Sequence, residues 1–225
     1  MIRKTKEALA EPRPQTLREA ADPPDSSTNG DPRDGRDGGL AVHRGFARGS
    51  RAKTRPGDQG LTRLRTGEEI FKDALPAEVC GTVDELVSVL GLARSMMSRP
   101  ETRELLLGLQ KDLFLAGAEA ATPPDRAGEL PARIDARKVR ELDACRRRLD
   151  RRREMPRHFV IPGGTPASAH LDLARAVARR CERRFVSLTR AGGCRNKHLL
   201  GWLNRLSDVL WRLARTEEPP DGESK

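Results

Sequence analysis

The chain of 225 residues is long enough for one ordinary domain with extensions, and its formal net charge of +10 favours an anionic partner. Only 3% of the residues are aromatic, which argues against a protein that stacks the bases of single-stranded nucleic acid. No apolar run approaches the ~18 residues of a membrane span, and the N-terminus lacks the apolar core of a secretory signal, so we expect a cytoplasmic protein without a membrane partner.

Residues 1–52 contain eleven glycines and prolines and hardly any large apolar side chains. Such a segment cannot bury enough surface to offset the entropy cost of ordering it, so we predict a disordered N-terminal arm. The short tail 216–225 has a similar composition and is expected to be disordered as well. The folded domain is therefore expected to span residues 53–215.

Between these ends, apolar residues recur at three- and four-residue steps, the spacing of amphipathic helices. The first helix is predicted to begin at Thr82, whose hydroxyl would cap it while Glu85, three residues on, reaches back. A second helix is expected to begin near Pro100, a residue that suits a first helical turn, and to end before the proline pair at 123.

Three further helices are predicted in the second half of the chain. One runs from Ile134 to about Arg153 and is followed by a loop at PRHFVIPGGT, where two prolines and a glycine pair break the periodicity. A fourth helix begins at Thr165, and leucines in residues 199–213 line one face of a fifth at alternating four- and three-residue steps. These patterns predict an all-α fold, a five-helix up-and-down bundle.

The four cysteines form no CxxC pair, and the four histidines form no metal-binding motif. We therefore expect reduced, packed thiols and no metal ligands from the protein itself. This cysteine usage is typical of an intracellular protein.

Positive charge is concentrated in residues 133–190, which carry seventeen Lys/Arg against seven Asp/Glu, an excess equal to that of the whole chain. The densest part is ARAVARRCERR, residues 174–184. On a helix, Arg175, Arg179 and Glu182 would lie within about 60° of one another beside the apolar stripe. Arg180 and Arg184 would point to the opposite side, into water. Two interpretations are open: a charged helix boundary in which Glu182 pairs locally with an arginine, or partly buried arginines that bind phosphate groups.

Two other stretches give weaker signals. KTRPGDQGLT, residues 53–62, has two glycines three apart and a threonine that would place N–H groups and a hydroxyl against phosphates, although an ordinary turn explains it better. On the fifth helix, Asn204 and Asp208 lie one turn apart opposite the leucines, together with Gly201 and Trp211. This face is either solvated or a contact face for another subunit.

Four motifs occur in the order found in one known family: GTVDEL (81–86), FVIPGG (159–164), ARAVARRCERR (174–184) and LNRLSD (203–208). Together with the TRPGDQGLT loop, they resemble the PduO-type ATP:cob(I)alamin adenosyltransferases over about residues 53–215. The resemblance implies a five-helix bundle that assembles as a homotrimer with active sites between subunits. It also implies transfer of the 5'-deoxyadenosyl group of ATP to the cobalt of cob(I)alamin, with release of triphosphate and with Mg²⁺ on the phosphates.

The resemblance assigns a phosphate-binding role to the N-terminal loop and to a lysine that follows it. The residues that match are Thr54, Arg55, Gly57, Thr62 and Lys72. These positions are expected to hold and neutralise the triphosphate chain of ATP.

The other matches fall on the helices and on the proline-rich loop. Residues expected to complete the nucleotide site from a neighbouring subunit are Arg179, Arg180, Glu182 and Arg183, and Asn204 matches an asparagine that contacts ATP. Asp84 and Arg175 match a salt-bridged pair between subunits, and Phe159 matches the phenylalanine beneath the corrin. Arg179, Asp84, Arg175 and Phe159 are therefore the residues expected to matter most for catalysis.

The chain departs from the family pattern at Pro56, Gln59, Val87 and Asp172. Pro56 removes a backbone N–H from the phosphate loop, and Gln59 stands in place of a usual lysine, so weaker ATP binding is one expected consequence. Val87 and Asp172 replace an asparagine and a histidine near the expected subunit contact. We expect these two to affect cobalamin more than ATP.

Three functions are open, in this order. The first is an adenosyltransferase, with a cobalamin reductase and a cobalamin-dependent enzyme as expected partners. The second is a non-catalytic carrier or sensor of adenosylcobalamin with the same bundle, and the third is a basic helical nucleic-acid binder. Because Co(I) is a strong nucleophile and triphosphate leaves as an anion, the first function is expected to rest on positioning and charge neutralisation.

Overall fold

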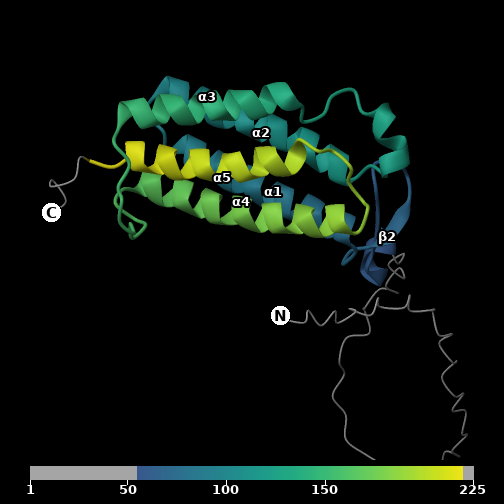
Figure 1. Cartoon of the computed structure of the whole chain (residues 1–225). Coiled ribbons are helices and arrows are strands. Elements are labelled where there is room, and N and C mark those ends of the chain that lie inside the picture. Colours follow the sequence, from purple (N-terminus) through teal and green to yellow (C-terminus); the bar gives the residue numbers. More distant parts are fainter. Residues whose placement is uncertain (1–54, 220–225) are drawn as a thin grey trace, which may run out of the picture. The chain divides into compact units, whose positions relative to one another are not determined.

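Apolar residues at helical spacing fold into five long helices, as predicted, in a computed structural model that describes residues 55–219. The helices are α1 (Leu75–Ser95), α2 (Pro100–Ala120), α3 (Ala136–Arg152), α4 (Pro166–Arg190) and α5 (Leu199–Thr216). They run alternately up and down the bundle (Figure 1). The predicted arm, Thr54 and residues 220–225 of the predicted tail lie outside the described residues.

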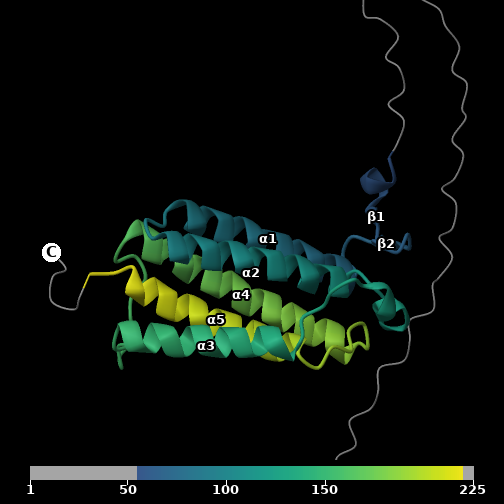
Figure 2. The ribbon, with the colours of Figure 1, turned by 90° about the horizontal axis from the view of Figure 1, so that it is seen from above.

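The bundle core is built around α4 and α5. Helix α4 packs against both α1 and α5, while α3 covers α5 and α2 covers α1 (Figure 2). The leucine face of α5 is fully buried, as its periodicity predicts, together with Trp202 and with Phe185 of α4. Burial of each such side chain contributes about 2 kcal/mol, so this seam is one large contribution to the stability of the fold. No helix within residues 55–219 is long and apolar enough to cross a membrane.

The helix starts show which capping signals act. At α4, Thr165 accepts a hydrogen bond from the N–H of Ser168 at 3.0 Å, and the Ser168 hydroxyl accepts one from the N–H of Thr165 at 3.0 Å, a reciprocal capping box. At α1 the predicted start at Thr82 is wrong, because the helix begins at Leu75 and Thr82 lies inside it. There the Thr82 hydroxyl donates to the carbonyl of Glu78 at 2.8 Å. Pro76, within the first turn, is the signal that marks the true start.

A small antiparallel hairpin precedes the bundle and was not predicted. Strand β1 (Leu61–Arg63) pairs with β2 (Glu69–Phe71), with Thr62 opposite Ile70, after a 3₁₀ turn at η1 (Pro56–Gln59). Three-residue strands are too short to show alternation in the sequence. The hairpin is tied to the end of α2, where Arg65 donates to the hydroxyl of Thr122 at 3.3 Å.

A buried carboxylate fastens the same end of the bundle. Glu119 accepts a hydrogen bond from the backbone N–H of Ile134 at 2.8 Å and one from the amide of Asn196 at 2.7 Å. The Asn196 amide also donates to the carbonyl of Ile134 at 2.7 Å. Burial raises the pKa of Glu119, and the two donors act in the opposite direction. One side chain of α2 thereby joins the segment between η2 (Pro124–Glu129) and α3 to the turn before α5.

The variant Glu119→Ala should lose about 2–4 kcal/mol of unfolding free energy, because the buried N–H of Ile134 loses its acceptor and the partly buried amide of Asn196 loses one of two. The expected fall in melting temperature is roughly 5–12 °C. Glu141→Ala is the matched control, since it removes an exposed carboxylate that pairs with Arg137 on the surface of α3. A Glu119→Ala protein that melts with the control would contradict this role.

The four cysteines are free thiols, as expected, and Cys145, Cys181 and Cys194 are buried. Burial raises the pKa of Cys181 to about 12. At pH 8 its thiolate fraction should be lower than that of an unfolded thiol by about a thousandfold, so a disulfide reagent should label Cys181 only after denaturation. Fast labelling of Cys181 in the folded protein, located by mass spectrometry, would overturn this expectation.

Candidate functional site

A polar hollow of about 300 Å³ lies on the face shared by α4 and α5. Arg175 and Arg179 of α4 line it from one side. From α5 it is lined by Asn204, Ser207, Asp208 and Trp211. The hollow thus unites two predicted arginines with the predicted face of the last helix. Ser207 was not predicted, although its place three residues after Asn204 puts it on the same face of a helix.

The α4 arginines divide into two groups according to what lies opposite them. Arg180 forms an ion pair with Glu85 of α1, and Arg184 forms one with Glu78 of α1 at 3.0 Å. Both side chains are about half exposed, as expected for the solvated side, but each has a carboxylate partner on α1 that the sequence did not predict. Arg179 and Arg183 are exposed and form no ion pair within residues 55–219. These two retain an uncompensated charge at and near the hollow.

Glu182 does not pair with an arginine of its own helix. Its carboxylate accepts a hydrogen bond from the amide of Asn204 at 3.3 Å, which joins α4 to α5 beside the hollow. Arg175 does have a partner on α4, since its Nε lies 3.5 Å from a carboxylate oxygen of Asp172. The local boundary interpretation, in which Glu182 pairs with an arginine of its own helix, is therefore wrong.

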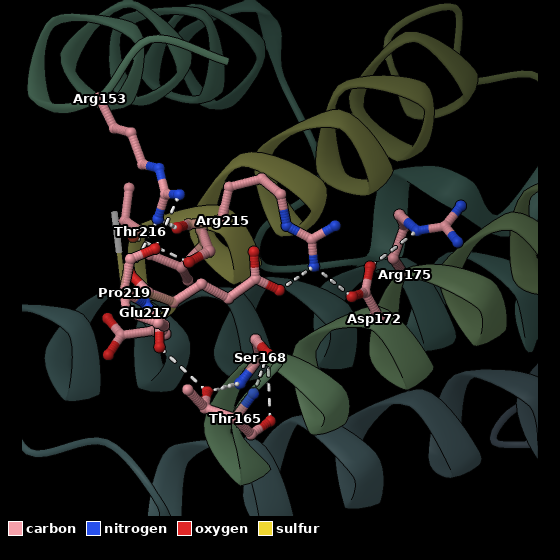
Figure 3. A network of polar contacts seen from close by, with 11 residues as sticks. Arg153, Thr165, Ser168, Asp172, Arg175, Arg215, Thr216, Glu217 and Pro219 are labelled. Carbon is pink, nitrogen blue, oxygen red and sulfur yellow. Dashed lines mark hydrogen bonds and ion pairs between the residues drawn. The ribbon is translucent and has the colours of Figure 1, made fainter. Parts of the chain in front are cut away.

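Asp172 lies inside the bundle and not on an outer contact surface. It is only 4% exposed and forms an ion pair with Arg215 of α5, which is 1% exposed. Figure 3 shows this carboxylate between the two guanidinium groups of Arg215 and Arg175. The residue that departs from the family pattern here is thus one partner of a buried ion pair.

The N-terminal loop and the lysine that follows it form one unit through the hairpin. Lys72, directly after β2, donates from Nζ to the carbonyl of Gly57 at 2.7 Å. The N–H of Arg55 donates to the carboxylate of Asp58 at 2.9 Å, and the chain reverses at Gly60, whose φ of 76° favours glycine. The pairing of β1 with β2 therefore places the ammonium group and the glycine-containing turn together, which sequence spacing alone did not reveal.

Asp84 and Phe159 are both open to the surroundings. Asp84 is exposed on α1 and forms no ion pair with any described residue. Phe159 is fully exposed in the loop between α3 and α4, close in sequence to Ile161, which is 88% exposed. Two large apolar side chains in water on one short loop indicate a surface that is covered when something binds.

The predicted residues therefore form separate groups within one chain. The first is the hairpin unit with Arg55, Gly57 and Lys72, and the second is the polar hollow with Arg175, Arg179 and Asn204. No hydrogen bond or ion pair joins these groups within residues 55–219. A single chain presents the parts of a phosphate site without bringing them together.

Comparison with known proteins gives a consistent result. Residues 52–217 match the sequence profile of the family described as cobalamin adenosyltransferase. The chain is 39% identical over 168 residues to a corrinoid adenosyltransferase of Citrobacter freundii, a match that covers 75% of this chain and 95% of the relative. It is 36% identical to the corrinoid adenosyltransferase PduO of the same organism, with 73% of this chain covered and about half (49%) of that longer relative.

Among solved structures, the fold is similar to a variant PduO-type ATP:corrinoid adenosyltransferase from Lactobacillus reuteri complexed with cobalamin and ATP. The TM-score is 0.66 at 29% sequence identity, and the match covers 72% of this chain and 91% of the other. The sequence-based assignment of fold and family is thereby confirmed.

Proposed function

The chain belongs to the cobalamin adenosyltransferase family, and we propose that it transfers the 5'-deoxyadenosyl group of ATP to the cobalt of cob(I)alamin. In this reaction Co(I) attacks the C5' carbon of ATP, a Co–C bond forms, the C5'–O bond breaks, and triphosphate leaves with the bonding electron pair. Cobalt is formally oxidised by two electrons and no proton transfer is needed. The protein's task is therefore to position two substrates and to neutralise an anionic leaving group.

We propose that the hairpin unit holds the triphosphate chain. Lys72 supplies an ammonium group beside the Gly57 carbonyl, and Arg55 adds a second, exposed cation. Thr62 on β1 supplies a hydroxyl, and Thr54, outside the described residues, belongs to the same loop in sequence. These groups match the chemistry of a polyphosphate, because they combine point charges with hydrogen-bond donors.

The polar hollow is proposed to complete the site of a neighbouring subunit. Arg179 and Arg183 carry positive charge without an ion-pair partner in the described chain, and Asn204 offers an amide beside them. Glu182 orients that amide. Arg180, although paired with Glu85, is half-exposed and lies on the same helix, so it adds to the positive field. A homotrimer closes the arrangement, since each chain then gives its loop to one site and its α4 to the next.

The subunit contact is proposed to include Asp84 and Arg175. Asp84 is an exposed carboxylate without an ion pair in the described chain, and Arg175 is held in place by Asp172 at 3.5 Å. An arginine that is already oriented loses less entropy when it pairs with a second carboxylate. Charge complementarity therefore supports this contact.

Mg²⁺ is proposed to arrive with ATP and not to occupy a protein cage. Residues 55–219 contain no group of three or more His, Cys, Asp or Glu side chains placed to hold a metal ion. Mg²⁺ usually keeps several waters and binds substrate phosphates together with one or two carboxylates, so it needs no cage of protein ligands. When bound, it would neutralise charge on the leaving triphosphate.

The free, buried thiols support a cytoplasmic location, where a cobalamin reductase and a cobalamin-dependent enzyme would act before and after this step.

Phe159 is proposed to pack beneath the corrin ring and to exclude a lower axial ligand. Its side chain is fully exposed on the loop that also carries Ile161. An apolar surface under the ring favours four-coordinate cobalt, because no donor replaces the lost ligand.

The observation that carries the proposal is the polar hollow, whose Arg179 forms no ion pair with any residue from 55 to 219, in a chain that belongs to this family. The direct test is incubation of the protein with ATP and chemically reduced cobalamin. A light-sensitive Co–C product formed together with triphosphate is the expected result. Tight cobalamin binding without triphosphate release would instead identify a carrier.

Arg179→Ala should reduce kcat/KM for ATP by about thirty- to a thousandfold, because it removes a charge-assisted contact worth roughly 2–4 kcal/mol. Arg184→Ala, one charge removed from the same helix, is the matched control. Its ion pair with Glu78 is about half exposed and worth ~0.5 kcal/mol, so activity should stay within about twofold. Equal losses in the two variants would show a diffuse electrostatic effect and no pocket.

Sedimentation velocity at micromolar concentration should give one species with the mass of three chains. Asp84→Arg should raise the concentration needed for assembly by about tenfold or more, since it would face Arg175 of a neighbour with like charge. Glu104→Arg is the control, because it reverses an exposed carboxylate on α2. A wild-type monomer over this range would refute the shared site.

A further inference from the structure

The chain does not end with α5. Residues 215–219, here called the C-terminal strap, bind side chains at three other helix ends: the start of α2, the end of α3 and the start of α4. Arg99, at the start of α2, donates to the carbonyl of Thr216 at 2.6 Å. Arg153, at the end of α3, donates to the carbonyls of Glu218 at 2.8 Å and Pro219 at 3.0 Å, and also to that of Arg215. These contacts extend four residues into the segment that the sequence places in a tail.

A buried ion pair fixes the strap to the bundle. Arg215 lies in the core with Asp172 beside it and with a carboxylate oxygen of Glu218 at 2.8 Å (Figure 3). Breaking a buried ion pair strongly destabilises the fold, because it leaves an uncompensated charge in the core. The pair therefore restricts the conformations of the residues that follow Arg215. The strap is therefore a fixed feature on which other segments can rest.

Both ends of the loop that carries Phe159 rest on this strap. The loop, residues 154–164, begins directly after Arg153 and ends directly before Thr165, whose hydroxyl donates to the carbonyl of Glu217 at 3.0 Å. Gly164 also packs against the strap, because a Cβ added there would lie only 3.1 Å from Cγ of Glu218. Segments more than fifty residues apart in the chain are thus joined on both sides of the loop.

We propose that the C-terminal strap positions the Phe159 loop for the corrinoid, with Arg153 and Thr165 as the positioning residues. The inference rests on the proposed function, in which Phe159 meets the corrin. A loop whose ends are already fixed loses less conformational freedom when its apolar side chains are covered, so affinity for the corrinoid rises. ATP binding, at Lys72 and Arg179, does not depend on the strap in the same way.

The test compares variants that break the strap contacts but leave the buried pair untouched. Thr165→Asp keeps an acceptor for the helix cap but loses the hydroxyl that donates to Glu217. Thr165→Ser keeps both contacts and should behave as wild type. Arg153→Met removes the guanidinium, and Arg157→Met is its control, since Arg157 is a highly exposed arginine of the same loop with only a weak pair to Glu154 at 3.7 Å.

Hydrogen exchange of amides in residues 154–164, without substrates, is the first measurement. Exchange should be about tenfold faster in Thr165→Asp and Arg153→Met than in the two controls, as expected for loss of a hydrogen bond that restrains the loop. Steady-state kinetics is the second measurement. The KM for cob(I)alamin should rise about five- to tenfold in the same two variants, with the KM for ATP within about twofold.

Unchanged exchange in both variants would overturn the proposal, as would faster exchange with an unchanged KM for cob(I)alamin. A rise of both KM values together would show a general effect on the substrate sites and would also count against it. If wild-type protein forms no Co–C product while loop exchange responds as expected, the proposed function fails and the hold of the strap on the loop stands.

Discussion

Helix α4 is buried along two sides, against α1 and against α5, and this packing constrains every charge on it. Its apolar stripe, which includes Phe185 and Cys181, must face both neighbours, so the five arginines of residues 174–184 are confined to the edges. At the edge towards α1, acidic residues Glu78 and Glu85 neutralise two of them. At the edge towards α5, Asn204, Ser207 and Asp208 line the polar hollow, and Asp172 pairs with Arg175. Arg179, at the same hollow, and Arg183, one turn further along α4, form no ion pair with a described residue and keep their charge.

Within residues 55–219 of one chain, the polar hollow has positive charge but no second surface that excludes water from it. Exposed arginines are well solvated, and their value for catalysis appears only when an anion and a second surface exclude water from them. The hairpin unit, with Lys72 against the Gly57 carbonyl, has the complementary deficit, since it offers donors without an enclosing wall. In the proposed homotrimer, a site shared between identical subunits would resolve both deficits with one interface. In the proposed scheme, the buried Asp172–Arg215 pair connects the ATP side of the site with the corrinoid side. The Asp172 carboxylate contacts Arg175, which lines the polar hollow, and also Arg215, the first residue of the strap near the Phe159 loop.

Local patterns in the sequence predicted the five helices, the start of the fourth helix at Thr165 and the arginine edge, because each depends on neighbours within a few residues. Local patterns also misled at Thr82, where a threonine three residues before Glu85 copies a capping motif inside a helix whose first turn is marked by Pro76. The pairing of Arg180 and Arg184 depends on the register between α1 and α4, which no local spacing encodes. The hairpin, the Glu119 network and the strap depend on contacts between distant segments, and for these the sequence offers no periodic signal.

The central claim, that each site takes its loop from one chain and its arginine from another, is tested most directly by mixing two inactive variants. Lys72→Ala removes the loop cation, and Arg179→Ala removes the α4 cation, so each homotrimer lacks one group at all its sites. Random mixed trimers made by co-refolding equal amounts should regain about a quarter of wild-type activity, since one site in four then combines an intact loop with an intact α4. Activity in the mixture no higher than the mean of the two separate variants would contradict the shared site and place both groups in the same chain.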